Sequence, residues 1–175
     1  MVIWLVGISG SGKTTLGRKL EEYFKQKNLE TVLIDGDEVR SFFNSDLGYS
    51  VKDREENIKR IQLAAYFLSK TEVVTIVCNI SPFENLRKFS REKINNYVQI
   101  YLKRDFDICK ETDVKDVYKE NNGVTALVGQ DIKFDEPENN DLVLDTNKES
   151  EEESFNNIIN LLETKIVEKV SKIAV

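Results

Sequence analysis

Histidine is absent from this sequence, which excludes imidazole both as an acid–base catalyst and as a metal ligand. Any acid–base chemistry must therefore use aspartate, glutamate, lysine or tyrosine. Cysteine is nearly absent as well, because Cys78 and Cys109 are the only two and lie far apart. Their positions lack the spacing of a metal site, so we expect two reduced and largely buried thiols in a cytoplasmic protein.

Positive charge is also scarce. The chain carries 25 lysines and arginines against 31 aspartates and glutamates, which gives a net charge of −6. No basic surface is therefore expected that would bind nucleic acid or anionic lipid. An acidic protein that handles anionic substrates must gather its lysines and arginines locally, so their positions matter more than their number.

Long hydrophobic runs are missing too. The chain opens with the short apolar run Val2–Val6, which follows no basic segment and is too short to cross a bilayer. We therefore expect neither a signal peptide nor a membrane helix, and a cytoplasmic location.

What remains is the pattern of an α/β protein. A chain of 175 residues can bury one core, so we expect a single domain over residues 1–175. Short apolar runs predict buried strands at Val2–Val6, Thr31–Ile34, Val73–Cys78, Tyr97–Leu102 and Leu142–Leu144. Helical spacing of apolar residues predicts helices at Lys13–Gln26, Asp53–Ser69 with Asp53 as N-cap, Pro82–Ile94 and Ser154–Ile173. This alternation predicts a doubly wound, mainly parallel sheet with helices on both faces.

One long segment does not fit the alternation. The polar stretch Glu111–Asn140 has no clear periodicity and contains two glycines and a proline. A long irregular segment in a compact domain is commonly functional, so we expect a lid at about residues 111–130.

The strongest motif in the chain is a phosphate-binding loop. Between the first strand and the first helix stands the complete P-loop pattern, Gly7-Ile8-Ser9-Gly10-Ser11-Gly12-Lys13-Thr14. Glycines let backbone N–H groups converge on phosphate oxygens at a helix N-terminus, where the helix dipole also favours negative charge. We expect Lys13 to reach the β- and γ-phosphates of ATP and the Thr14 hydroxyl to bind Mg²⁺. The predicted ATP-binding residues are Gly7, Ser9, Gly10, Ser11, Gly12, Lys13, Thr14 and Thr15.

Two further features favour a kinase among P-loop proteins. The Asn-Lys-x-Asp element that specifies guanine in GTPases is absent, and Asp35-Gly36-Asp37 follows the second strand. The carboxyl end of such a strand is where open α/β sheets bind ligands. A carboxylate there can accept the proton of an acceptor hydroxyl or orient the water molecules of Mg²⁺. The alternative is an ordinary polar turn, but next to a P-loop the pattern favours catalysis.

A cluster of basic and amide side chains follows. Arg40 comes about one helical turn after Asp37, and Arg54 and Asn57 share one face of the predicted helix. Guanidinium groups suit bidentate binding of phosphate or sulfate. We interpret Lys59 and Arg60 instead as members of a surface ion-pair network.

With these motifs in this order, the chain resembles the adenylylsulfate kinase family. The resemblance is carried by the P-loop, Asp35-Gly36-Asp37-x-x-Arg40, Asp46-Leu47-Gly48-Tyr49-Ser50, Asp53-Arg54-x-x-Asn57-Ile58-x-Arg60, and Ile80-Ser81-Pro82 with Arg87. Weaker similarities continue through Cys109, Asp113-x-Lys115-x-x-Tyr118, Gly129-x-Asp131, Glu136-Pro137 and Leu144-Asp145-Thr146.

The resemblance implies transfer of the γ-phosphate of ATP to the ribose 3′-hydroxyl of a nucleotide with an anionic tail. It makes Asp37 the candidate base or Mg²⁺ ligand, with Asp35 beside it and Lys13 as the third catalytic residue. It implies a P-loop kinase fold, Mg²⁺ as cofactor, ATP and an anionic nucleotide as partners, and a homodimer. The acceptor-binding residues that it implies are Arg40, Tyr49, Arg54, Asn57, Ile80, Ser81, Lys115 and Leu127.

One departure from the family bears on the acceptor. Leu127 stands where the family usually has an aromatic residue against the acceptor's adenine. Loss of one stacking face weakens base binding by about 1–3 kcal/mol, and a pyrimidine needs a smaller platform. We therefore favour cytidine diphosphoramidate, the acceptor of a family relative in capsular phosphoramidate biosynthesis, over adenylyl sulfate. A kinase of an unrelated metabolite and a non-catalytic nucleotide-binding regulatory protein are the remaining alternatives.

Overall fold

The computed structural model of the protein describes residues 1–44, 46–112 and 126–173. Five strands form one parallel sheet in the order β2-β3-β1-β4-β5. The strands are β1 Val2–Val6, β2 Thr31–Asp35, β3 Val74–Cys78, β4 Tyr97–Lys103 and β5 Leu142–Asp145. The predicted α/β class and the doubly wound parallel sheet are thus confirmed.

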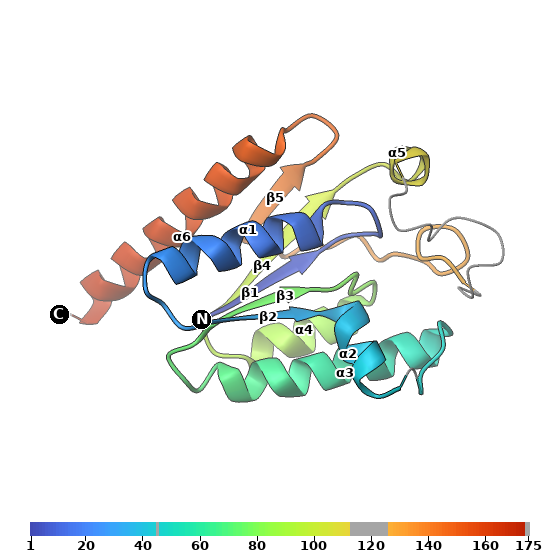
Figure 1. The fold of residues 1–175 in the computed structure, drawn as a ribbon, viewed down its shortest axis with the longest axis horizontal. Coiled ribbons are helices and arrows are strands. Elements are labelled where there is room, and N and C mark those ends of the chain that lie inside the picture. The colour runs from blue at the N-terminus through green and yellow to red at the C-terminus, as the bar shows by residue number, and fades with distance from the viewer. Residues whose placement is uncertain (45, 113–125, 174–175) are drawn as a thin grey trace.

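Helices cover both faces of this sheet (Figure 1). They are α1 Lys13–Gln26, α2 Gly36–Phe42, α3 Val51–Leu68, α4 Glu84–Lys93, α5 Phe106–Glu111 and α6 Glu151–Ile173. Helices α1 and α6 lie on one face, and α3 and α4 lie on the other. No helix in the described ranges is long and apolar enough to cross a membrane.

The two cores follow from the alternation of side chains along the strands. In β1, Ile3 and Leu5 pack with residues of α1 and α6, such as Leu20. Their neighbours in the same strand, including Trp4, pack instead with α3 around Ile61. A strand that is buried on both faces in this way must be apolar at every position, which explains its continuous hydrophobic run.

Three helix starts, those of α3, α4 and α6, differ from the predicted positions, and α6 begins at Glu151 instead of Ser154. The predicted N-cap Asp53 is wrong, because Ser50 caps α3 and its Oγ accepts a hydrogen bond from the Asp53 backbone N–H at 3.2 Å. Asp53 is instead the third residue of the helix, and its carboxylate accepts the Ser50 hydroxyl at 2.7 Å. Helix α4 begins at Glu84, after Pro82, because the backbone of its N-cap Phe83 is extended; the Pro82 carbonyl accepts from the backbone N–H of Asp135. The short helices α2 and α5 were not predicted.

One glycine lets α1 approach the sheet closely. A Cβ added at Gly17 would lie 2.4 Å from Cys78 Sγ and 3.2 Å from Leu33 Cδ1. The Cys78 thiol is itself buried and donates to the Lys13 carbonyl at 3.2 Å, so it has little room to move. The first turn of α1, which begins with the P-loop lysine, thus depends on a glycine one turn later.

We expect Gly17→Ala to lower the free energy of unfolding by about 1–3 kcal/mol through overpacking, as measured by urea denaturation. In a Cys78→Ala background, Gly17→Ala should lower the free energy of unfolding by much less, because removal of the sulfur makes room for the methyl group. Equal stability of Gly17→Ala and the wild type would show that the helix shifts freely at this contact.

Candidate active site

The P-loop connects β1 to α1 at the carboxyl edge of the sheet. Gly10 and Gly12 have φ angles of 80° and 98°, which explains why glycine stands at both positions. Ser11 is fully buried and Ser9 half-buried within the loop, whereas Thr15 is exposed on α1. The left-handed glycines therefore let the loop turn tightly, so that its backbone N–H groups can converge on a phosphate.

Lys13 points back into the loop. Its Nζ donates to the Ile8 carbonyl at 2.7 Å and to Ser11 Oγ at 3.4 Å, and the residue is buried. This arrangement holds the ammonium group among the backbone N–H groups that would surround a phosphate. A positive charge is thus already in place where a triphosphate would add negative charge.

The carboxylate of Asp35 connects the P-loop to the end of β2. Thr14 Oγ1 donates to Asp35 Oδ2 at 2.9 Å, and Asp35 Oδ1 accepts the Asp37 backbone N–H at 2.9 Å. Asp35 therefore also caps α2, and it places Asp37 in the exposed first turn of that helix. The structure thus brings Thr14, Asp35 and Asp37 together, and Asp35 is the carboxylate that accepts the Thr14 hydroxyl.

These oxygens fit a magnesium ion. Mg²⁺ is commonly bound by one or two protein oxygens together with phosphate and water oxygens. Thr14 and Asp35 present a hydroxyl and a carboxylate within hydrogen-bond distance of one another. No group of three or more Asp, Glu or Cys side chains that could hold an ion by themselves occurs in the described part of the chain. Thr14 and Asp35 therefore supply two oxygens of the kind that bind Mg²⁺ together with phosphate oxygens.

Two arginines enclose the segment between α2 and α3. Arg40 is buried and donates to the carbonyls of Leu47, at 3.2 Å, and Gly48. Arg54 donates to the Tyr49 carbonyl at 3.1 Å, and the two guanidinium carbons lie 4.8 Å and 5.4 Å from the centre of the Tyr49 ring. Burial, and then the nearby charge of Arg40, lower the pKa of Arg54. Such close like charges favour the binding of an anion between them.

Asn57 is buried against the start of α2. It is 2% exposed, and its Nδ2 donates to the Gly36 carbonyl at 3.0 Å. Its Oδ1 is buried and accepts no hydrogen bond from any described residue. A buried amide oxygen without a partner costs free energy, and a donor on a bound ligand would remove that cost.

The loop after β3 completes this edge of the sheet. Ser81 has a φ angle of 48° and is 1% exposed. Its hydroxyl donates to Asn79 Oδ1 at 2.8 Å and accepts the indole N–H of Trp4 at 2.9 Å. Asn79 in turn lies against α2, since a Cβ at Gly36 would come within 2.4 Å of its Nδ2. Sequence reasoning missed Asn79, although a polar residue at the end of a buried strand was a usable signal.

The segment after the predicted lid reaches the same edge. The Ala126 carbonyl accepts a hydrogen bond from Arg54 Nη2 at 2.7 Å, and the next residue is the half-buried Leu127. The predicted residue Lys115 and most of the predicted lid lie outside the described residues. Arg60 forms a surface ion pair with Asp46 at 2.7 Å, in line with its interpretation as a surface ion-pair residue.

Comparisons with known proteins agree on one family. The family model "Adenylylsulphate kinase" matches residues 1–145. The adenylyl-sulfate kinase of Halothermothrix orenii is 35% identical over 167 residues, which cover 94% of this chain and 90% of that protein. The probable adenylyl-sulfate kinase of Bacillus subtilis is 34% identical over 94% of this chain and 86% of that protein.

A solved structure shows the same fold. The Mycobacterium tuberculosis APS kinase CysC, determined in complex with AMPPNP and APS, superposes with a TM-score of 0.84. It is 29% identical, and the match covers 93% of this chain and 96% of the other. With the P-loop and the neighbouring carboxylates in place, the chain belongs to the adenylylsulphate kinase family and is an ATP-dependent nucleotide 3′-kinase of that type.

Proposed function

We propose that the protein transfers the γ-phosphate of ATP to the ribose 3′-hydroxyl of adenylyl sulfate. One observation carries the proposal: Arg40 and Arg54 flank Tyr49 at the same edge of the sheet as the hydrogen-bonded pair Thr14 and Asp35. An anion site beside an aromatic ring suits a nucleotide with a charged tail, and the P-loop supplies the phosphate donor. The names of the relatives support adenylyl sulfate rather than the cytidine acceptor favoured by the sequence.

The donor side of the reaction uses the P-loop. Backbone N–H groups of Gly10 to Lys13 would hold the β-phosphate, and Lys13 Nζ would move from the Ile8 carbonyl to the β- and γ-oxygens. Thr14 and Asp35 would hold Mg²⁺, which supplies further positive charge to the phosphate oxygens when bound. Closure of the predicted lid would exclude water and suppress hydrolysis of ATP.

The acceptor side uses the exposed carboxylate of Asp37. Its backbone is fixed by the hydrogen bond to Asp35, and its negative charge partly offsets the lowering of the Arg54 pKa that burial and Arg40 cause. There it can orient the ribose hydroxyl and accept its proton late in the transfer. Arg40, Arg54 and Asn57 would bind the acceptor's phosphate and tail, and Tyr49 and Ser81 would border its base and ribose.

Cytidine diphosphoramidate remains a second candidate because of Leu127. Its neighbour Ala126 is hydrogen-bonded to Arg54, which supports a place for Leu127 beside the acceptor, where leucine would offer no aromatic face. Without an aromatic stacking partner, a smaller base would lose less binding free energy than adenine.

A coupled ADP-release assay with both acceptors tests the assignment. We expect a higher kcat/KM with adenylyl sulfate, and we expect Leu127→Phe to raise it by about tenfold or more through base stacking. A conservative Leu127→Ile variant is the matched control and should leave the ratio of the two acceptors unchanged. Turnover of cytidine diphosphoramidate alone would refute adenylyl sulfate as the substrate and assign the cytidine compound in its place.

A further inference from the structure

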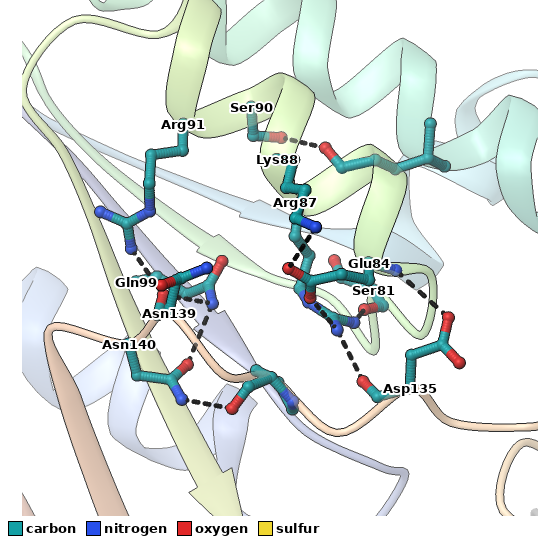
Figure 2. Close-up of polar contacts among 12 residues, drawn as sticks. Ser81, Glu84, Arg87, Lys88, Ser90, Arg91, Gln99, Asp135, Asn139 and Asn140 are labelled. Carbon is teal, nitrogen blue, oxygen red and sulfur yellow. Dashed lines mark hydrogen bonds and ion pairs between the residues drawn. The ribbon is translucent and has the colours of Figure 1, made fainter.

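Arg87 of α4 joins two segments that are far apart in the sequence. It is 3% exposed, and each guanidinium nitrogen donates a hydrogen bond. Nη1 donates to the Ser81 carbonyl and Nη2 to the Asp135 carbonyl, both at 2.6 Å, and Nε donates to Glu84 at 3.0 Å. Figure 2 shows Arg87 between the loop of Ser81 and the segment that contains Asp135.

Both carbonyls belong to segments of the proposed acceptor site. Ser81 stands in the loop after β3 with a φ angle of 48°, a conformation that a non-glycine residue adopts only where its surroundings hold it. Asp135 ends the segment that starts at Ala126, whose carbonyl accepts from Arg54. This segment is therefore tied to one arginine of the acceptor site at its start and to Arg87 at its end.

The same two segments meet elsewhere as well. The Asp135 backbone N–H donates to the Pro82 carbonyl at 2.9 Å, and the Glu84 backbone N–H donates to Asp135 Oδ2 at 3.4 Å. A small hydrophobic cluster then joins them to the P-loop. Its buried members are Ile8, Cys109, Val128 and Ile132, with Ile80, Phe83 and Phe134 among those packed against it. Displacement of either segment would therefore change the space opposite the P-loop.

An arginine is suited to this position because its planar fork donates in several fixed directions. A lysine at the same site keeps the charge but cannot span both carbonyls and Glu84 in one geometry. One of the carbonyls would then lose its buried donor, and the two segments would no longer be held at a fixed separation.

We propose that Arg87 is a positioning residue for the acceptor, which holds the Ser81 loop and the Ala126–Asp135 segment together as the two walls of the acceptor pocket. The proposal rests on the proposed function for the identity of the acceptor. Arg87 acts through the two carbonyls of Ser81 and Asp135, and among the described residues its guanidinium group donates no hydrogen bond to the P-loop. Its loss should therefore affect the acceptor far more than ATP.

The test compares Arg87→Lys with Arg91→Lys, one turn further along α4. Arg91 is a matched control because it also bonds to the chain after the lid, at the Asn139 carbonyl (2.9 Å) and Asp141 (3.0 Å), but does not reach Ser81 (Figure 2). We expect Arg87→Lys to raise the KM for the acceptor about tenfold and the KM for ATP less than twofold. Arg91→Lys should change neither by more than about twofold. Equal effects of the two variants, or equal effects on both substrates, would overturn the proposal.

Trp4 provides a readout that does not depend on turnover. It is the only tryptophan of the chain, and its indole N–H donates to the Ser81 hydroxyl. We expect the emission of Arg87→Lys to shift to longer wavelength, because water reaches a loosened Ser81 loop, and that of Arg91→Lys to match the wild type. Failure of the wild type to phosphorylate either acceptor would refute the proposed function, whereas unchanged Trp4 emission in Arg87→Lys would refute the role of Arg87.

A milder variant covers the case in which Arg87→Lys does not fold. Glu84→Ala removes, at a partly exposed position, the carboxylate that accepts from both Nε and Nη2 of Arg87, so the guanidinium group that holds the two carbonyls is less firmly oriented. We expect a rise in the acceptor KM of about threefold, with the KM for ATP unchanged. A KM for the acceptor equal to that of the wild type would contradict the positioning role.

Discussion

Replacement of Asp37 by asparagine is expected to lower kcat by about 10²- to 10⁴-fold, the range lost with a general base. The amide has the same shape, and the backbone N–H of residue 37 can still donate to Asp35. It cannot accept a proton from the ribose hydroxyl, however. ATP binding relies on the P-loop, so its dissociation constant, measured by calorimetry, should change by less than about twofold.

The neighbouring residue Glu38 supplies the control for this variant. It is an exposed acid in the same helical turn, so Glu38→Gln removes the same formal charge without touching the proposed base. Its kcat should remain within about twofold of the wild type. A kcat of Asp37→Asn that stays near the wild-type value would remove Asp37 from the mechanism.

Replacement of Lys13 by alanine should lower kcat/KM for ATP by about 10³-fold, as expected for loss of a group that stabilises charge in the transition state. The ammonium group is held inside the P-loop by the Ile8 carbonyl and Ser11, in the loop that would bind the phosphates. The measurement is initial-rate kinetics at varied ATP concentration with saturating acceptor.

Lys19 of the same helix is the matched control for Lys13. It is partly exposed and ion-paired with Glu151 and Glu152 on α6. Lys19→Ala should therefore change stability slightly and kcat/KM not at all. A thermal melt of both variants separates a loss of fold from a loss of chemistry. A decrease of less than about tenfold in correctly folded Lys13→Ala would show that the backbone of the loop carries most of the phosphate binding.

Several structural features were accessible to sequence reasoning because the signals are local. The strand β1 reads as an uninterrupted apolar run, since both of its faces are buried, and α1 shows apolar residues at helical spacing. The short helices α2 and α5 span seven and six residues, which is too few for such a periodicity to appear. The start of α3 was misplaced for a related reason. Ser50 and Asp53 can both cap a helix, and only the backbone geometry shows that Ser50 does so.

By itself, the sequence determined the strand and helix alternation and the P-loop, because each depends on residues that are contiguous or one turn apart. The tertiary structure alone decided which carboxylate meets Thr14, 21 residues away, and that Trp4 bonds to Ser81, 77 residues away. It also decided that Arg87 joins the loop of Ser81 to Asp135, which lies 48 residues after Arg87 in the sequence. Such partners meet only because parallel strands bring their carboxyl ends to one edge of the sheet, and the order of those strands is not encoded in any local pattern.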